Sequence, residues 1–350
     1  MDQKTILVSG GAGYIGSHVC VVLAEAGYRP LILDNFSNSK TSVIDRLTIL
    51  LGARPTAIEG DIRDAHQLTK IFETYTCAGV IHLAGLKAVE ESVQQPLHYY
   101  EVNVSGSLTF LRVLKESGVK KIIFSSSAAV YGEQSKELLS ENALLNPINP
   151  YGRSKLMVEE ILEDFSRAEP DFSIFKLRYF NPIGAHPSGL IGESPSGIPS
   201  NLMPYMTEVA RGLRKRLSIF GNDYPTPDGT AIRDYIHVMD LAEGHVAAFQ
   251  AAERSAGLWT LNLGTGRGSS VLEMVHAFEA VSGIKIPYEI APRRLGDVPS
   301  CCANPKAAHE QLRWSAKRDL YEMCADSWHW QCCSTPEAIH DERAYKAHSS

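Results

Sequence analysis

Short aliphatic runs alternate with longer segments of helical periodicity over the first 180 residues, and this alternation limits the folds open to the chain. Runs such as Thr5–Val8 and Val80–Leu83 are apolar throughout, which is typical of strands covered on both faces by helices. The alternation predicts an α/β fold, with a doubly wound parallel sheet of the Rossmann type. The other expected strands are Leu31–Leu33, Thr56–Ile58, Lys121–Phe124 and Ser173–Leu177, and the expected helices are Tyr14–Ala26, Lys40–Leu51, Ala65–Tyr75, Leu97–Glu116 and Tyr151–Arg167.

The rest of the chain predicts a smaller lobe. Phe180–Pro204 is rich in Gly, Pro and Ser and has little periodicity, and a loop this long in a compact chain is often functional. We expect one domain over 1–180, to which a segment near 233–265 can return, then a mixed α/β lobe over 181–333 and a polar tail over 334–350. The elements expected in the lobe are helices at Tyr205–Arg216, Leu272–Val281 and Asp319–Gln331 and a strand at Trp259–Leu263.

Composition argues against several kinds of partner. Lys and Arg number 34 and Asp and Glu 40, a net charge of −6 that does not fit a nucleic-acid binder with a basic face. No apolar run approaches the ~18 residues of a membrane span, so no membrane partner is expected. The seven cysteines are odd in number and include two vicinal pairs, which suits neither a disulfide framework nor zinc-ligand spacing. We therefore expect free thiols, no metal and a cytoplasmic location, the more so because a strand near Lys4 leaves no room for a signal peptide.

A glycine-rich stretch, Ser9–Gly16, leads directly from the first strand into the first helix. Gly11, Gly13 and Gly16 satisfy G-x-G-x-x-G, whose glycines permit a tight turn, close approach to a pyrophosphate and packing of helix on strand. Taken alone, the same motif can be a plain structural turn. The second strand ends at Asp34, 18 residues after Gly16, near the ~20-residue offset of a carboxylate that holds an adenosine ribose. A carboxylate there repels a 2′-phosphate, so the sequence predicts NAD in preference to NADP.

Tyr151 and Lys155 lie four positions apart at the start of an expected helix and therefore share one face. Tyrosine has a pKa of about 10 and is a poor base at neutral pH, but a nearby ammonium stabilises the phenolate. Such a pair is common on helices and is weak evidence by itself. The strand before it ends in Ser125–Ser127, where a serine could bind the same substrate oxygen as the tyrosine or satisfy its own backbone.

The glycine loop, the serine strand end and the Tyr-x-x-x-Lys pair occur in the order typical of the extended short-chain dehydrogenase/reductase family. Longer blocks resemble one group of that family, the UDP-galactose 4-epimerases, from about Lys4 to Cys333. The blocks that carry this resemblance are Ala84–Val89, Arg178–His186, Asn201–Tyr205, Ile219–Tyr224, Arg233–Val238 and Trp328–Trp330.

The resemblance implies that tightly bound NAD oxidises UDP-galactose or UDP-glucose at C4, the 4-keto sugar turns over, and the hydride returns to its other face. Tyr151 would then be the base for the C4 hydroxyl, Ser127 would hydrogen-bond that oxygen, and Lys155 would bind the nicotinamide ribose and tune Tyr151. The cofactor would be lined by Gly10, Gly13, Tyr14, Ile15, Gly16, Asp34, Asn35, Ser37, Asn38, Ser39, Asp61, Ile62, Leu83, Ala84, Gly85, Lys87, Asn103, Tyr151, Lys155 and Tyr179. The nucleotide sugar would be held by Lys87, Ser127, Phe180, Asn181, Asn201, Leu202, Ser218, Phe220, Arg233, Arg294, Asp297 and Cys301.

The chain departs from the family pattern at three positions. Ser9 stands where the family usually has Thr, a conservative change, and Val102 stands where some members have a second Asn, so the cofactor role is carried only to Asn103. Members selective for unmodified hexoses have a bulky Tyr four residues after the equivalent of Asp297, where this chain has Cys301. The smaller thiol leaves room for an acetamido group at C2, so we also expect UDP-GlcNAc and UDP-GalNAc as substrates, unless other side chains close the gap.

Other functions stay open at this stage. A nucleotide-sugar 4,6-dehydratase would have an Asp-Glu pair after the active-site hydroxyl residue, whereas Ser127 is followed by two alanines. A UDP-pentose or UDP-glucuronate 4-epimerase is less firmly excluded, and a non-catalytic NAD-binding regulator would normally lack Tyr151 or Lys155. The resemblance also implies a homodimer that pairs through the helices at Leu97–Glu116 and Tyr151–Arg167.

Overall fold

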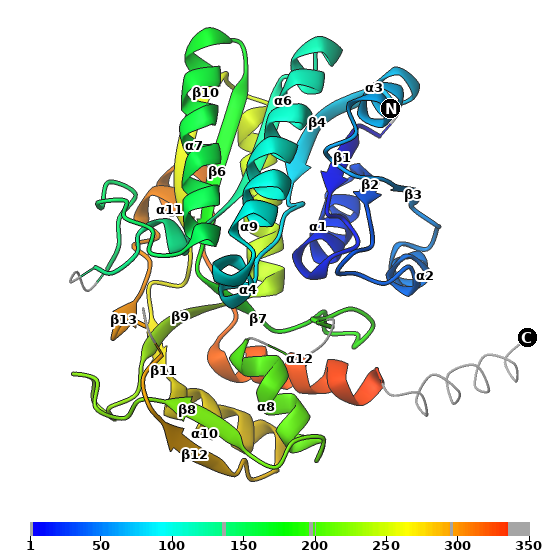
Figure 1. Cartoon of the computed structure of the whole chain (residues 1–350). Coiled ribbons are helices and arrows are strands. Elements are labelled where there is room, and N and C mark those ends of the chain that lie inside the picture. The colour runs from blue at the N-terminus through cyan, green and yellow to red at the C-terminus, as the bar shows by residue number, and fades with distance from the viewer. Residues whose placement is uncertain (1–2, 135–137, 196–198, 200, 295–296, 335–350) are drawn as a thin grey trace, which may run out of the picture.

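Seven parallel strands form the central sheet in the order β10-β6-β5-β4-β1-β2-β3 (Figure 1). The computed structural model describes residues 3–134, 138–195, 199, 201–294 and 297–334. The strands of this sheet are β1 (Thr5–Ser9), β2 (Arg29–Asp34), β3 (Thr56–Glu59), β4 (Cys77–His82), β5 (Lys121–Ser127), β6 (Ser173–Tyr179) and β10 (Gly257–Leu263). The predicted fold class, a doubly wound parallel sheet, is confirmed.

Helices cover both faces of this sheet. They are α1 (Tyr14–Glu25), α2 (Ser42–Leu51), α9 (Val238–Ala252) and α11 (Lys306–Leu312) on one face, and α3 (Ala65–Thr74), α6 (Gly106–Ser117) and α7 (Pro150–Ala168) on the other. Strand β1 shows why its run is apolar throughout. Ile6 and Val8 pack into the cluster with α1 and α9, while Leu7 packs into the cluster with α3, α6 and α7.

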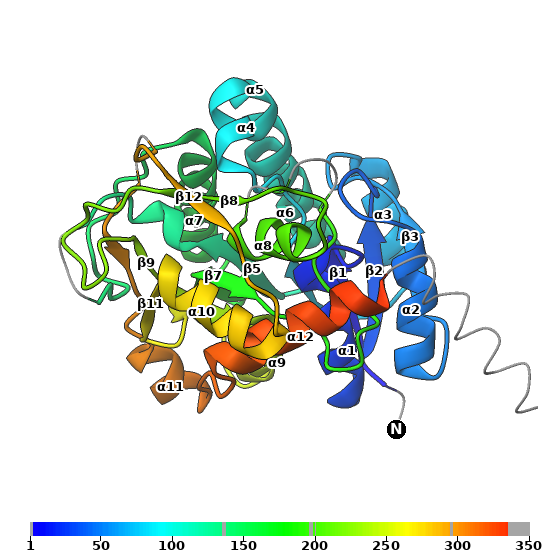
Figure 2. The same ribbon diagram turned by 90° about the horizontal axis from the view of Figure 1, so that it is seen from below.

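A smaller group of elements lies below the carboxyl ends of the large sheet in Figure 1. Its strands are β7 (Asn181–Ile183), β9 (Ile232–His237), β11 (Gly268–Ser270) and β13 (Ser300–Cys301) in one sheet, and β8 (Leu217–Phe220) with β12 (Tyr288–Ala291) in another. Its helices are α8 (Leu202–Ala210), α10 (Val271–Ser282) and α12 (Leu320–Cys333), which share a core with β8 (Figure 2). Because β10 belongs to the large sheet while β9 does not, the chain passes between the two parts more than once. The division at residue 180 stays a prediction.

Two predicted helices differ from the structure. The segment Leu97–Glu116, expected as one helix, follows a separate α4 (Val89–Gln94) and is divided into α5 (Pro96–Tyr99), a π-helical stretch (Tyr100–Ser105) and α6. The helix expected at Tyr205–Arg216 is α8, which stops at Ala210 because Gly212 adopts a left-handed backbone conformation with φ 72°.

Helix α9 was not predicted at all. Twelve of its 15 residues are buried between the sheet and α1, so the segment lacks the polar face on which a periodic pattern depends. Within the described ranges, none of the helices combines the length and hydrophobicity that crossing a bilayer requires.

Candidate active site

A cleft of ≈ 1390 Å³ lies between the carboxyl ends of the large sheet and the smaller lobe. The residues that follow β1, β2, β4, β5 and β6 line it, as expected of an open parallel sheet, whose ligands bind beyond the strand ends. Its volume exceeds the roughly 300–1,000 Å³ typical of a site for one small molecule, so the cleft has room for two ligands side by side.

The glycine loop forms a tight cradle at one end of this cleft. A Cβ on Gly16 would lie 2.1 Å from the carbonyl oxygen of Gly10, and a Cβ on Gly10 would lie 2.8 Å from the amide nitrogen of Ala84. Helix α1 begins at Tyr14, and its N-cap, Gly13, provides no side-chain cap for the first amides. The positive end of α1 is therefore left for an anion, as a pyrophosphate requires.

The predicted ribose carboxylate, Asp34, is buried at the end of β2 with 8% of its surface exposed. Its Oδ2 accepts a hydrogen bond from the amide of Ala12 at 2.9 Å, and its Oδ1 accepts bonds from the amide of Phe36 and the hydroxyl of Ser39. The carboxylate is thus fixed in place before any ligand arrives, and it lines the cleft together with Asn35, Ser37 and Asn38.

Asp61 lies two residues beyond β3, which ends at Glu59, and so stands in the loop that follows the strand. The strand pairing with β2 stops at Glu59, and the chain then turns through Gly60, whose amide donates to the Asp34 carbonyl. Hydrogen bonds from the Arg63 guanidinium lower the pKa of Asp61 to about 2. The residue therefore presents a fixed, ionised carboxylate to the cleft.

Ser127, Tyr151 and Lys155 all line the cleft, close to the middle of the sheet. Ser127 is the last residue of β5, while Tyr151 and Lys155 lie in the first turns of α7, which Pro150 begins and Asn149 caps by accepting from the Gly152 amide. Burial raises the pKa of Tyr151, and a hydrogen bond with Ser127 and the positive charge of Lys87 oppose that rise.

Lys155 is held by a backbone carbonyl at the end of β5. Its ammonium donates to the carbonyl oxygen of Ser125 at 2.8 Å, and burial lowers its pKa to about 8 while the charge of Glu159 opposes that fall. The cation whose charge favours the Tyr151 phenolate is Lys87. The expectation that Lys155 tunes Tyr151 stays a prediction for the enzyme with its cofactor.

A buried ion pair that the sequence analysis missed lies under the serine strand end. Glu159, fully buried on α7, accepts three hydrogen bonds of 2.6–3.2 Å from the guanidinium of Arg178 on β6 and one from the Ser126 hydroxyl. Because a buried charge needs a partner, this pair locks α7 against β5 and β6. Ser127 is one residue from Ser126 and Tyr151 is two helical turns from Glu159, so the pair also fixes the spacing between Ser127 and Tyr151.

The lobe side of the cleft is built from paired charges. Asp297 accepts from Arg233 at 3.3 Å and from Arg294 at 3.0 Å, and the Arg294 guanidinium lies 4.6 Å from the centre of the Phe220 ring. Cys301 lies beside Arg233 in the pairing of β13 with β9, and burial raises the pKa of its thiol to about 11. The thiol is therefore a small neutral group on the cleft wall.

Most of the predicted site residues line the cleft, and five do not. The amide of Asn103 is used instead to hold the loop after β4, since it accepts from the amide of Leu86 and donates to its carbonyl and to Ser154. The other four, Leu202, Ser218, Phe220 and Arg294, belong to the lobe, where Arg294 reaches the cleft through Asp297. The roles assigned to all five stay predictions.

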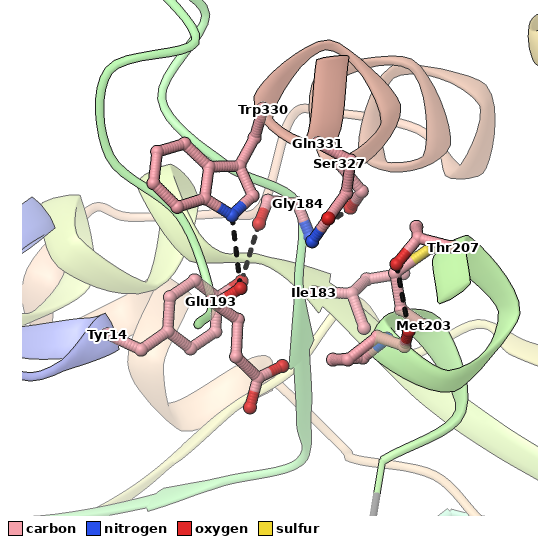
Figure 3. Close-up of a pocket in the computed structure, with 10 residues that line it drawn as sticks. Tyr14, Ile183, Gly184, Glu193, Met203, Thr207, Ser327, Trp330 and Gln331 are labelled. Carbon is pink, nitrogen blue, oxygen red and sulfur yellow. Dashed lines mark hydrogen bonds between the residues drawn. The ribbon is translucent and has the colours of Figure 1, made fainter. Parts of the chain in front are cut away.

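Two further cleft residues, Tyr179 and Glu193, have buried polar atoms. The hydroxyl of Tyr179, at the end of β6, is buried without a well-formed hydrogen bond among the described residues, so it is available to a ligand. Glu193 is a nearly buried carboxylate that the sequence analysis missed, although it is the one charged residue in Phe180–Pro204. It also borders a small cavity of ≈ 10 Å³, with room for one water molecule, shown in Figure 3.

The glycine cradle, the fixed Asp34 carboxylate and the buried Tyr179 hydroxyl fit a dinucleotide. Within the described ranges, by contrast, no group of three or more His, Cys, Asp or Glu side chains is arranged to hold a metal ion.

Comparison with known proteins agrees with this site. A family described as GDP-mannose 4,6 dehydratase matches residues 7–327. A UDP-glucose 4-epimerase of Yersinia pestis is 55% identical over 327 residues, which cover 93% of this chain and 97% of that protein. The crystal structure of UDP-glucose 4-epimerase from Bifidobacterium longum in complex with NAD+ and UDP is 46% identical, with a TM-score of 0.92 and coverage of 96% and 100% of the two chains.

A third relative, the UDP-Glc/GlcNAc 4-epimerase of Campylobacter jejuni, is 38% identical, with a TM-score of 0.82 and coverage of 94% of this chain and 99% of that one. These matches extend over the large sheet and the lobe alike, and they agree in fold and in length with the chain described here. The chain therefore belongs to the UDP-glucose 4-epimerase family of the extended short-chain dehydrogenases/reductases.

Proposed function

We propose that this protein is an enzyme that interconverts UDP-galactose and UDP-glucose by NAD-dependent epimerisation at C4. The observation that carries the proposal is the placement of Ser127, Tyr151 and Lys155 in one cleft between a dinucleotide cradle and an arginine-bearing lobe. Relatives that match nearly the whole chain are UDP-glucose 4-epimerases, and one of them was crystallised with NAD+ and UDP. NAD would lie along the glycine loop, Asp34 and Tyr179, and the UDP group along Arg233 and Asp297.

The residues of this chain divide the chemistry between them. Tyr151 removes the proton of the C4 hydroxyl as the 4-keto sugar forms and returns a proton when the sugar is reduced, so it is regenerated in each turnover. NAD held along the glycine loop and Asp34 would supply the redox chemistry, a reversible hydride transfer at C4. Ser127 hydrogen-bonds the C4 oxygen, and the positive charge of Lys87 favours the Tyr151 phenolate.

Binding energy belongs on the UDP group because the hexose must turn over between the two half-reactions. The guanidinium of Arg233 suits a diphosphate, since charge-assisted hydrogen bonds to phosphate are strong and directional. Contacts remote from C4 hold the nucleotide while the sugar rotates, which is an economical use of binding energy.

The matching family is described as GDP-mannose 4,6 dehydratase, but the residues that follow Ser127 do not favour a dehydratase reaction. Ser127 is followed by Ala128 and Ala129, which form a short turn and line the cleft without an acid or base. Removal of water from C5 and C6 needs a proton donor and acceptor near those carbons. Epimerisation at C4 needs a base for the C4 hydroxyl, which Tyr151 provides, and no proton donor or acceptor at C5 and C6.

The test uses purified protein, UDP-galactose and no added NAD, with the products resolved by chromatography. We expect conversion to UDP-glucose, because the cofactor stays bound through purification. Replacement of Tyr151 by Phe should keep NAD, measured by absorbance after denaturation, and lower kcat by about 10²–10⁴-fold. Substantial turnover in Tyr151→Phe would contradict the assigned base.

We further propose that the enzyme accepts UDP-GalNAc and UDP-GlcNAc, because Cys301 is small and lines the cleft. The Campylobacter jejuni relative, named for both UDP-Glc and UDP-GlcNAc, supports this proposal. Cys301→Tyr should lose turnover of UDP-GalNAc at least tenfold and keep that of UDP-galactose, since the phenol ring fills the space of the acetamido group. Equal activity of the variant on both sugars would show that other side chains set the specificity.

We also propose a homodimer. Val89 and Val93 on α4, Leu97 on α5 and Met157 on α7 are large apolar side chains with 41–81% of their surface exposed, and these helices contact one another. Exposed apolar side chains on helices that contact one another fit a partner copy. Sedimentation equilibrium should give about twice the chain mass of 38.4 kDa, and Leu97→Asp should reduce it to the monomer mass.

The proposed location is the cytoplasm. Cys20, Cys301 and Cys324 are thiols, which persist in a reducing compartment. Cell fractionation followed by immunoblotting would test this, and recovery only from an extracytoplasmic fraction would refute it.

A further inference from the structure

Glu193 places a carboxylate in a cleft proposed to hold two diphosphates. Only 8% of the residue is exposed. A negative charge near bound phosphates weakens their binding, and more so where water is excluded. The negative charge of Glu193 would therefore not help to bind the ligands, and its hydrogen bonds indicate another role.

One oxygen of Glu193 joins the two sides of the cleft. Its Oε1 accepts from the ammonium of Lys87 at 2.8 Å and from the side-chain amide of Asn201 at 2.9 Å. Lys87 lies between β4 and α4, on the side of the large sheet, whereas Asn201 is the N-cap of α8 in the lobe. Both residues line the cleft and are predicted ligand contacts.

The backbone of Glu193 is anchored independently of its carboxylate. Its carbonyl oxygen accepts from the indole of Trp330 on α12 at 3.0 Å, and the guanidinium of Arg46 lies 4.7 Å from the centre of the Trp330 ring. A Cβ on Gly192 would lie 2.4 Å from that ring, so the close approach needs glycine. Figure 3 shows the Glu193 side chain extending away from the indole, with its carboxylate separate from this anchor.

We propose that Glu193 is a positioning residue, whose carboxylate holds Lys87 and Asn201 in one arrangement ready for the nucleotide sugar. The inference rests on the proposed function. The Lys87 side chain is 48% exposed on a flexible stem, so without a partner it samples many rotamers that ligand binding must restrict. Holding it beforehand lowers that cost, and the same oxygen orients the Asn201 amide.

Two substitutions separate positioning from charge. Glu193→Gln keeps a carbonyl oxygen that accepts from both donors and removes the negative charge, so UDP should bind at least as tightly as to the wild type. Glu193→Ala removes the acceptor, and we expect the dissociation constant for UDP to rise about tenfold, since two hydrogen bonds are lost. Isothermal titration calorimetry of UDP with the NAD-containing enzyme measures both, and the KM for UDP-galactose should follow.

A third substitution controls for the loss of a carboxylate in the same cleft. Glu208 on α8 also lines the cleft, but its side chain is paired with Arg214. Glu208→Ala should leave the dissociation constant for UDP within about twofold, because the Glu208 carboxylate is paired with Arg214 and not with a predicted ligand contact. The melting temperature of each variant shows whether the fold is retained.

Coupling to Asn201 is a direct test of the bridge. In the Asn201→Ala background, a further Glu193→Ala change should weaken UDP binding by less than it does in the wild type, because part of the arrangement is already lost. Equal effects in the two backgrounds would overturn the bridge, as would unchanged or tighter UDP binding by Glu193→Ala. A wild-type protein that converts no UDP-galactose but shows this pattern of UDP affinities would refute the proposed reaction and leave the positioning role intact.

Discussion

The two sides of the cleft present different kinds of groups to a ligand. The side formed by the large sheet relies on backbone and on buried groups, such as the cradle of Gly10 and Gly16 and the fixed carboxylate of Asp34. The lobe side relies on side chains paired with one another, among them Arg233 and Arg294 on Asp297. Polar groups on the first side have little freedom to move, whereas those on the second can exchange a protein partner for a ligand.

This difference matches the demands of the proposed reaction. A cofactor that is regenerated in every turnover can stay bound, so a rigid cradle with its hydrogen bonds already arranged is suitable. A nucleotide sugar must enter and leave, and an arginine that has Asp297 as an alternative partner avoids leaving a bare charge when the ligand departs. Ser127 and Tyr151, the proposed catalytic residues, are held by the rigid side, through β5 and α7.

The largest effect that separates the two sides is expected from Gly16→Ala. The added methyl group would lie 2.1 Å from the Gly10 carbonyl and 2.8 Å from the Gly11 Cα, and neither backbone atom can move without opening the cradle. We expect NAD affinity to fall on the order of 100-fold, while UDP binding by the lobe is retained. NAD content after purification and calorimetry with UDP measure the two effects.

The control for this substitution is Gly118→Ala, at the end of α6. Gly118 has φ 74° and open space around its Cα, so alanine there strains the backbone without touching the cleft. It should lower the melting temperature and keep NAD. Equal loss of NAD in both variants would show that the cradle is not specifically tuned to the cofactor.

Arg233→Met, on the lobe side, should weaken UDP binding and leave NAD binding unchanged. The change removes the guanidinium and leaves the Asp297 charge facing the diphosphate, so the UDP dissociation constant should rise about 10–100-fold. NAD content should stay as in the wild type. Arg293→Met is the matched control, because Arg293 pairs with the exposed Asp223, and it should change UDP binding little. Loss of NAD from Arg233→Met would contradict the separation of the two sides.

How much the sequence predicted follows the same division. The cofactor side was predictable because its parts follow strand ends at regular intervals, so the glycine loop and Asp34 could be located by spacing alone. The lobe side comes from segments such as Asn181, Asn201, Arg233 and Asp297, whose proximity depends on the fold. Only the resemblance to a known family indicated them.

The misses have physical causes as well. Glu193 lies in a stretch without periodicity, so no pattern showed that it faces Lys87 across the cleft. Helix α9 is buried almost all round and so lacks an amphipathic pattern. The buried pair of Glu159 and Arg178 joins α7 to β6, and a charged residue on a helix is ordinarily interpreted as solvent-exposed.

The smallest expected effect is the pH dependence of the free energy of unfolding, and it arises from histidines on the side of the large sheet. His18 on α1, His82 on β4 and His245 on α9 all belong to the layers of the large sheet. Burial lowers the pKa of His18 and His82 to about 3 and that of His245 to about 4. In the unfolded chain these groups titrate near 6.5, so below that pH the unfolded state binds more protons than the folded one.

The free energy of unfolding should therefore be steady above pH 6.5 and fall as the pH decreases through the window from 6.5 to about 3, the lowest of these pKa values. Each histidine contributes a slope that approaches about 1.4 kcal/mol per pH unit. Urea denaturation at pH 7.5, 6.5, 5.5 and 5.0 would measure it. His82→Gln, which can keep hydrogen bonds to Ser9 and Ser107, should give a shallower slope, while His66→Gln, at an exposed site on α3, should not. Equal slopes for His82→Gln and the wild type would mean that His82 does not contribute to the acid lability.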